Sequence, residues 1–268
     1  MHSFVRLTAA AALLAAGALA QAAVIDTFSD GQAVADHYSG DGGGGWSQSA
    51  FSAGILGGYR EMYVEKVAPS LNVSTSSGIP GIFSLDATSI AQGGKYATNA
   101  PDDVTARSVI RWDGIDTLGQ TYIGQDATVN PALGYGLYTF NEAAVNTTNV
   151  IADLLAYGNT FNFVYSADHD VTLKIEVWSP AGGYAFIEDT LLSTGGVDVA
   201  GSLPIGLLAG LVDLNNITAL QLTVNGDGAV TELDFSFQPI EVPEPASLLL
   251  AGVALLGAGS VARRRKQK

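Results

Sequence analysis

The stretch FNFVYSADHDVTLKIEV, residues 161–177, decides the fold class of this chain. Every second residue on either side of its polar turn is apolar: Phe161, Phe163 and Tyr165 before it, and Val171, Leu173, Ile175 and Val177 after it. This period of two places one face of a strand against a core and the other face towards solvent. The stretch therefore predicts two half-buried antiparallel strands.

Residues 219–237 repeat this pattern around a second turn. Apolar residues alternate with polar ones before and after Asn225-Gly-Asp-Gly228. Asn and Gly tolerate the positive φ of tight turns, so the segment predicts a β-hairpin. Further strand candidates are residues 24–26, 59–67, 81–85, 104–112 and 136–140, whereas 150–156 and 204–212 fit either a short helix or a buried strand. The chain is thus expected to be all-β, with a single antiparallel β-sandwich of jelly-roll type.

Residues 1–22 have the three-part layout of a secretory signal peptide. A basic start containing Arg6 precedes an apolar stretch from Leu7 to Ala20, and Ala20-Gln21-Ala22 supplies small residues for cleavage. The apolar stretch has about 14 residues, fewer than the roughly 20 that span a bilayer. We expect a signal helix, export by the Sec machinery, and removal of residues 1–22 by signal peptidase.

The remaining body, residues 23–241, is strongly acidic. It holds six Lys and Arg against 25 Asp and Glu, a formal charge of −19, because the other six bases and Glu244 lie outside it. Such a surface repels nucleic acid, whose affinity for proteins comes mainly from Lys and Arg. Such a surface is compatible with binding of metal cations or neutral polymers, or it serves only to keep the protein soluble. The chain contains no cysteine, so its core, with or without a bound ion, must stabilise it.

Residues 242–268 combine three features in a fixed order. The two prolines of Val242-Pro-Glu-Pro245 favour an extended chain. Residues 246–262 carry no charge and would form about 25 Å of helix, the lower limit for crossing a membrane. The basic tail, residues 263–268, should stay in the cytoplasm. This order predicts a transmembrane helix with the body outside.

The same order resembles the PEP-CTERM sorting signal of Gram-negative bacteria. The resemblance implies processing by exosortase, a membrane-embedded, cysteine-dependent enzyme of organisms that commonly make exopolysaccharide. It implies an inner-membrane-anchored precursor that is then delivered to the cell surface or the extracellular space. The implied recognition residues are Pro243, Glu244 and Pro245, and the implied cytoplasmic retention residues are Arg263, Arg264 and Arg265.

The body more loosely resembles β-sandwich ectodomains and galactose-binding-like jelly rolls. The segments that carry this likeness are 26–31, 55–61, 111–114 and 232–237. The resemblance implies a fold and assigns no ligand residue.

Catalytic motifs are absent from the sequence of the body. It has two histidines, His37 and His169, and no Gly-x-Ser-x-Gly, His-Glu-x-x-His or phosphate-loop motif. Glu61 and Glu65 are the best candidates for a catalytic acid pair. Residues four apart on a strand, however, lie ~13 Å from each other, whereas the two catalytic carboxyl groups of glycosidases are ~5–9.5 Å apart. We therefore expect no enzymatic activity. A catalytic partner from a distant part of the sequence is left open for either acid.

Three tryptophans are the candidates for stacking on a sugar. Trp178 is out of phase with the apolar residues of 171–177 and should point away from the core beside Lys174 and Glu176, unless the register differs by one. Trp46 follows a glycine-rich loop, and Trp112 precedes Asp113-Gly114. A structural role stays open for each of them.

Calcium is the expected metal, because it prefers carboxylate and carbonyl oxygens. Asp26 and Asp30, near the first strand, can meet Asp234, near the last, if the terminal strands pair. Asp168 and Asp170 flank a turn and form a second candidate. Solvated turn aspartates are the alternative, since no EF-hand spacing is present.

These features predict an exported, non-enzymatic protein with a structural or adhesive role linked to exopolysaccharide. The alternative is a carbohydrate-binding module of jelly-roll type, with or without calcium. A secreted hydrolase is the third hypothesis, and it requires a long-range carboxylate pair.

Overall fold

The computed structural model describes residues 23–36, 45–68, 87–100, 104–114, 124–130, 135–140, 145–238 and 241–242. Within these ranges the regular structure is almost entirely β, in two large antiparallel sheets that form a sandwich. The predicted signal helix, the predicted transmembrane helix and the Pro243–Pro245 triplet lie outside the described residues. No helix among the described residues has the length and apolar character needed to cross a membrane.

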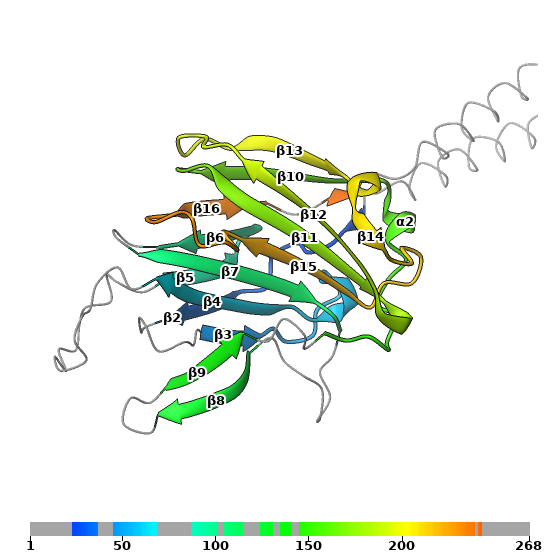
Figure 1. Ribbon diagram of the computed structural model, residues 1–268, viewed down its shortest axis with the longest axis horizontal. Helices are drawn as coiled ribbons and strands as arrows, with labels where there is room; N and C mark the ends of the chain where they lie inside the picture. Colours follow the sequence, from blue (N-terminus) through cyan, green and yellow to red (C-terminus); the bar gives the residue numbers. More distant parts are fainter. Residues whose placement is uncertain are drawn as a thin grey trace, which may run out of the picture.

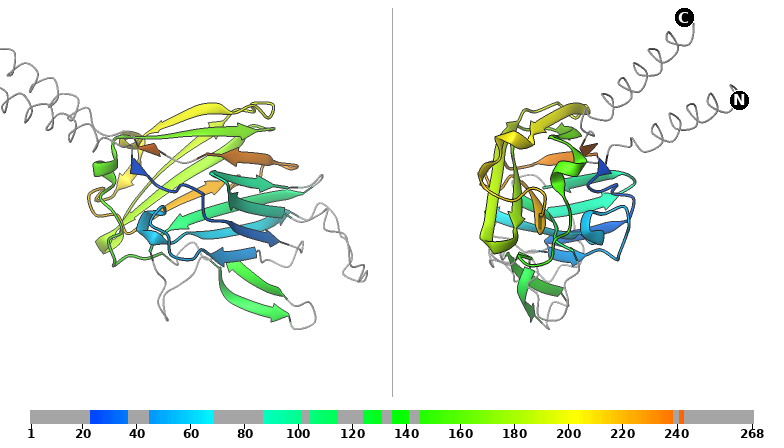
Figure 2. Two further views of the ribbon diagram at one scale, coloured as in Figure 1. Left: turned by 180° about the vertical axis from the view of Figure 1, so that it is seen from behind. Right: turned by 90° about the vertical axis from the view of Figure 1, so that its right-hand side faces the viewer.

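One layer of the sandwich is an eight-stranded sheet (Figures 1 and 2). Its strand order is β1-β17-β10-β16-β6-β5-β2, with β13 also paired to β10. The strands are β1 (Ala23–Val24), β17 (Glu241–Val242), β10 (Thr160–Ala167), β16 (Asp234–Phe237), β6 (Lys95–Asn99), β5 (Ala87–Gln92), β2 (Gln32–Asp36) and β13 (Val199–Pro204). The first and last described strands, β1 and β17, therefore pair with each other.

The other layer is a seven-stranded sheet with the order β14-β12-β11-β15-β7-β4-β3. Its strands are β14 (Ala209–Leu211), β12 (Gly183–Leu191), β11 (Val171–Ser179), β15 (Ala219–Val224), β7 (Thr105–Trp112), β4 (Glu61–Ala68) and β3 (Gly45–Gln48). A separate pair, β8 (Gly124–Asn130) and β9 (Tyr135–Phe140), lies beside β3 (Figure 1). The seven-stranded sheet holds the site described below.

Short helical turns resolve the two ambiguous segments. Residues 204–212 form the 3₁₀ turn η4 (Ile205–Leu207) followed by β14, and residues 150–156 run into the helix α2 (Leu154–Tyr157). The Asp153 side chain accepts a hydrogen bond from the backbone N–H of Ala156 (3.1 Å) and thereby caps α2. Among the described residues, the other 3₁₀ turns are η1 (Leu56–Gly58) and η3 (Pro180–Gly182).

The core lies between the two sheets and is built by their alternating residues. Phe161, Phe163, Tyr165, Val171, Leu173, Ile175 and Val177 are all buried, as the sequence pattern predicts. The eight-stranded sheet adds an aromatic cluster in which the rings of Phe28, Tyr96 and Phe237 are 5.1–6.1 Å apart. Hydrophobic burial of these faces is what joins the layers.

The predicted hairpin around residues 225–228 is wrong. Its two strands exist, but β15 belongs to the seven-stranded sheet and β16 to the eight-stranded sheet. Leu220, Leu222 and Val224 therefore face Phe235 and Phe237 across the core instead of pairing beside them. The turn carries the chain from one layer to the other, and the loop of residues 168–170 does the same between β10 and β11.

Candidate functional site

The outer face of the seven-stranded sheet carries an unusual set of large and charged side chains. They occupy the positions that alternate with the core residues of each strand, because successive side chains of a strand point to opposite faces. From β12 to β4 these outward residues are Tyr184, Phe186, Glu188, Thr172, Lys174, Glu176, Trp178, Gln221, Thr223, Arg107, Val109, Arg111, Glu61, Tyr63 and Glu65.

Three half-buried aromatic residues, Trp178, Tyr184 and Phe186, form what we call the aromatic platform. Trp178 on β11 is the cross-strand partner of Tyr184 on β12, and their ring centroids are 5.4 Å apart. Tyr184 and Phe186 stack at 6.0 Å with an interplanar angle of 26°. The rings thus form one continuous apolar surface over two neighbouring strands.

Two cationic side chains lie against the rings of the platform. The Arg111 guanidinium lies 5.9 Å from the Trp178 ring, and the Lys174 ammonium lies 5.2 Å from the Phe186 ring. Both distances are within the range of cation–π attraction. The platform is therefore bordered by fixed polar groups and has little freedom to rearrange.

A polar network joins the platform to the middle of the sheet. Oε1 of Glu176 accepts a hydrogen bond from the Tyr184 hydroxyl (2.7 Å) and lies 2.7 Å from Nζ of Lys174. Oε2 of Glu176 accepts a hydrogen bond from Nε2 of Gln221 (2.8 Å), and Oε1 of Gln221 accepts one from Nε of Arg111 (2.8 Å). Both oxygens of the Glu176 carboxylate are therefore engaged.

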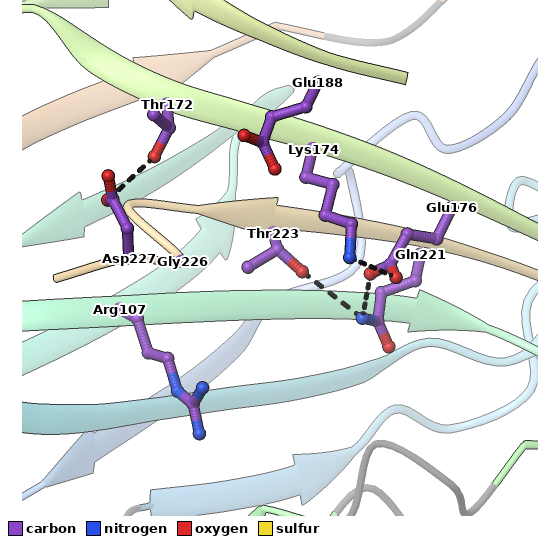
Figure 3. A pocket seen from close by; sticks show the side chains of 9 residues that line it. All are labelled: Arg107, Thr172, Lys174, Glu176, Glu188, Gln221, Thr223, Gly226 and Asp227. Atoms are coloured by element: carbon purple, nitrogen blue, oxygen red, sulfur yellow. Dashed lines mark hydrogen bonds and ion pairs between the residues drawn. The ribbon is translucent and has the colours of Figure 1, made fainter. Parts of the chain in front are cut away.

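A groove with a volume of about 290 Å³ lies beside this network (Figure 3). Its lining residues come from four neighbouring strands and one turn: Arg107, Thr172, Lys174, Glu176, Glu188, Gln221, Thr223, Gly226 and Asp227. Glu188 on β12 and Arg107 on β7 border it from opposite sides. The groove offers hydroxyl, amide, carboxylate and ammonium groups, the set that a polyhydroxylated ligand requires.

Glu61 and Glu65, the two acids considered as a pair in the sequence, both lie opposite arginines of β7. Oε1 of Glu65 lies 2.7 Å from Nε of Arg107, and Glu61 is the cross-strand partner of Arg111. Glu61 and Arg111 are buried, although they lie on the outer face. Glu65 is thus ion-paired with a base on β7, and Glu61 faces another base of the same strand across the sheet.

The protonation of the network is set by burial and by Glu176. Burial, followed by the hydrogen bond to Glu176, raises the pKa of Tyr184 to about 12. Burial lowers the pKa of Lys174, but the hydrogen bond and the charge of Glu176 outweigh it, so the net pKa is raised. At neutral pH Tyr184 is therefore a neutral hydroxyl and Lys174 an ammonium.

The structure separates the three candidate tryptophans. Trp178 lies on the outer face in the aromatic platform, as its phase predicts. Trp46 is half-buried and packs against Tyr63 and Val109, which form a second small apolar cluster. Trp112 is instead a core residue: it is fully buried, and its indole N–H donates to Oδ2 of Asp26 (2.8 Å). Its ring is thus not accessible for stacking on a ligand.

The candidate calcium ligands do not converge. Asp26 is buried and ion-paired with Arg60, Asp30 is exposed, and Asp234 is exposed and hydrogen-bonded to the Asn99 amide. The terminal strands do pair, but through β1 and β17, whereas Asp234 lies on β16. In the part of the chain that the structure describes, no three His, Cys, Asp or Glu side chains are grouped to hold a metal.

The sequence interpretation missed Tyr184, Phe186, Glu188, Arg107 and Gln221. A signal exists for part of this face: charged residues recur four positions apart, and so on one face of a strand, in Arg107-Ser-Val-Ile-Arg111 and in Glu61-Met-Tyr-Val-Glu65. Charges in phase with each other and out of phase with the core mark a polar sheet face. That pattern does not specify which strands pair, and so it does not predict which of these side chains become neighbours.

Three solved structures are distantly similar to this chain, and no curated protein matches the sequence. The agarase AgWH50C is 10% identical, with a TM-score of 0.35, over 59% of this chain and 22% of that one. A family 11 carbohydrate-binding module from Clostridium thermocellum, in complex with a β-1,3-1,4-mixed-linked tetrasaccharide, is 10% identical, with a TM-score of 0.30, over 81% and 96%. This chain spans only about a fifth of the length of the agarase.

A third similar structure is a family 43 arabinoxylan arabinofuranohydrolase from Bacillus subtilis in complex with cellotetraose. It is 8% identical, with a TM-score of 0.26, over 69% of this chain and 52% of that one. These three likenesses assign no ligand and no activity to this chain.

The C-terminal segment matches a known family. Residues 241–266 match the model of the PEP-CTERM protein-sorting motif. The match includes the Pro243–Pro245 triplet, the uncharged segment 246–262 and the bases Arg263, Arg264 and Arg265. Such a motif marks an exported protein that exosortase processes from a membrane-anchored precursor. Residues 241–266 of this chain are therefore a PEP-CTERM protein-sorting motif.

Proposed function

We propose that this chain is an exported protein whose body binds polysaccharide at the cell surface or in the extracellular matrix, in a structural or adhesive role. The sorting motif supports export and processing by exosortase. The observation that supports binding is the aromatic platform beside the groove. The flat apolar faces of aromatic rings pack against the C–H faces of sugars, while nearby polar groups fix the hydroxyls.

The preorganisation of the platform supports a binding role. Adjacent rings on an outer sheet face leave apolar area in contact with water, a feature that marks interaction surfaces. Trp178, Tyr184 and Phe186 are held by one another, by Arg111 and Lys174, and by the hydrogen bond from Tyr184 to Glu176. A surface ordered before the ligand arrives loses less entropy on binding.

The groove is less suited to hydrolysis. A glycosidase needs one carboxylic acid that donates a proton and a second carboxylate across the scissile bond. Both oxygens of Glu176 are already engaged, by hydrogen bonds from Tyr184 and Gln221 and by the ion pair with Lys174, so this side chain is not placed to donate a proton to a ligand. This favours binding without turnover.

The test is a panel of soluble polysaccharides screened by affinity electrophoresis with the full-length protein in detergent. We expect at least one polymer to retard the protein, with or without a chelator of calcium. Trp178→Ala should weaken that binding by tenfold or more, because tryptophan truncation at a binding centre costs about 2 kcal/mol. Phe51→Ala is the matched control, because it removes an exposed ring in the loop between β3 and β4, at the other end of the sheet from β11 and β12.

Three outcomes contradict the proposal. They are a panel in which no polymer binds, equal binding by wild type and Trp178→Ala, and release of reducing ends from a bound polymer. The last outcome would favour the hydrolase, and loss of binding in chelator would favour a calcium-dependent module.

A further inference from the structure

The chemical class of the ligand can be argued from the charges of the groove. Its two bases, Arg107 and Lys174, each have an acid at 2.7 Å, Glu65 and Glu176 respectively. These acids belong to the same sheet as the bases and lie on the same outer face. An incoming anion would therefore have to compete with a carboxylate already in place for either base.

Two further acids border the groove. Asp227, in the turn after β15, is exposed and accepts a hydrogen bond from the Thr172 hydroxyl (3.1 Å). Glu188 is exposed, and it makes no hydrogen bond or ion pair with the residues that the structure describes. The groove thus has two exposed acids that no base of the described residues neutralises, whereas each of its two bases is already ion-paired with an acid. Carboxylates of this kind bind hydroxyl donors by short, charge-assisted hydrogen bonds.

The body as a whole is acidic, although half of its bases lie on this face. The three bases Arg107, Arg111 and Lys174 are half of the six in residues 23–241, and the same segment contains 25 acids. Since the Debye length is about 8 Å at physiological salt, the acids beside the groove dominate what a ligand meets.

We infer that the groove takes a neutral, hydroxyl-rich polysaccharide and rejects polymers that carry carboxylate or sulfate groups. This inference rests on the proposed glycan binding and adds the class of glycan. Glu188 and Asp227 accept hydrogen bonds from sugar hydroxyls, and the same two carboxylates repel the anionic groups of an acidic polymer. The platform packs on the sugar rings and is indifferent to charge.

The experiment compares polymers that share a backbone and differ in charge. Suitable pairs are hydroxyethylcellulose with carboxymethylcellulose, dextran with dextran sulfate, and methyl-esterified pectin with pectate. Affinity electrophoresis of the full-length protein is run at about 50 and about 500 mM NaCl, which shortens the Debye length several-fold. In every pair that binds, we expect the neutral member to bind at least tenfold more tightly at low salt, with a smaller difference at high salt.

Two variants isolate the groove acids. Glu188→Gln and Asp227→Asn should each reduce the difference in affinity between the charged polymer and the neutral one. Asp189→Asn is the matched control, because Asp189 lies on the same strand as Glu188 but in register with the core residue Leu173, and so on the opposite face. It should leave the difference between the two polymers unchanged.

The inference is overturned if the charged member binds as tightly as the neutral one at low salt, with or without calcium. It is also overturned if neither salt nor Glu188→Gln alters the difference in affinity between the charged and the neutral polymer. Failure of every polymer to bind is a separate result, which rejects the proposed glycan binding itself.

Discussion

Both carboxylate oxygens of Asp26 lie 2.9 Å from Nη1 of Arg60, and both side chains are buried. The pair is enclosed by further hydrogen bonds: the Trp112 indole and the Phe28 amide donate to Asp26, while Arg60 donates to Oε1 of Gln32 and to the carbonyl of Asp30. Burial raises the pKa of Asp26, although the charge of Arg60 and these hydrogen bonds oppose the shift. The network connects the two sheets, because Gln32 lies on β2 of one sheet, while Trp112 lies on β7 of the other and Arg60 immediately precedes β4.

Breaking this pair should destabilise the fold strongly. Arg60→Met leaves a buried carboxylate without its counterion, which typically costs 3–5 kcal/mol, about the lower estimate of a whole domain's stability. Urea unfolding measures the loss. The control is Lys95→Met, which removes an exposed pair with Asp198 and should change stability by less than about 1 kcal/mol. Equal, small effects of both substitutions would contradict a structural role for Asp26 and Arg60.

Asn225 should matter through both its backbone and its amide. It is buried at φ 52°, a left-handed conformation, and its Nδ2 donates to the carbonyls of Ala106 (2.8 Å) and Val230 (2.9 Å). Asn225→Ala should cost about 2–4 kcal/mol, because it strains the backbone and leaves buried carbonyls without donors. Asn225→Gly should cost less, since glycine adopts positive φ freely.

Thermal denaturation followed by circular dichroism separates these cases. Asn215→Ala, in an exposed turn, is the control and should lie within about 0.5 kcal/mol of wild type. If the alanine and glycine variants of Asn225 were equally stable, the backbone conformation would not be contributing.

Alkaline pH should unfold the protein through its tyrosines. Burial raises the pKa of Tyr63, Tyr96, Tyr157 and Tyr184, the last to about 12. A phenol whose pKa is higher in the folded than in the unfolded chain stabilises the fold fully below the unfolded value of about 10, and this contribution is lost as pH rises through the folded value. Stability should therefore fall above pH ~10.

The measurement is a titration followed by absorbance at the phenolate band and by circular dichroism. We expect part of the phenolate signal to appear only together with the loss of β-structure. Complete ionisation of all ten tyrosines with the fold intact would contradict this expectation.

Processing at the sorting motif should depend on Glu244. The strand β17 ends at Val242, immediately before Pro243, and pairs with β1 and β10. Cleavage beyond this strand would leave the described fold complete, so the wild-type surface protein should have lost Lys268, and Glu244→Ala should accumulate uncut in the inner membrane.

Cell fractionation with mass spectrometry of the C-terminus checks this outcome. Glu241→Ala is the matched control, because it removes an acid just outside the Pro-Glu-Pro triplet, and it should be processed normally. Surface protein that uniformly ends in Lys268 would show that the chain is anchored and not processed.

Strand pattern and side-chain facing could be predicted from the sequence. The alternation over residues 171–177 predicts the buried residues of β11 and the outward position of Trp178, and the structure has both. The ordered features of residues 242–268 likewise predict the sorting motif that the family comparison finds at 241–266. These properties are local, because the two-residue period and the succession of proline, apolar and basic segments are contained within a few neighbouring residues.

The partners of each strand were decided only by the tertiary structure. Alternation around residues 225–228 is the same whether the turn returns the chain to its own sheet or carries it to the facing one, so the hairpin prediction failed. Asp26 acquires Arg60 from 34 residues away and Trp112 from 86, which turns a candidate calcium ligand and a candidate sugar contact into core residues. The aromatic platform and its groove arise in the same way, because pairing between strands brings together side chains that no short stretch of sequence contains.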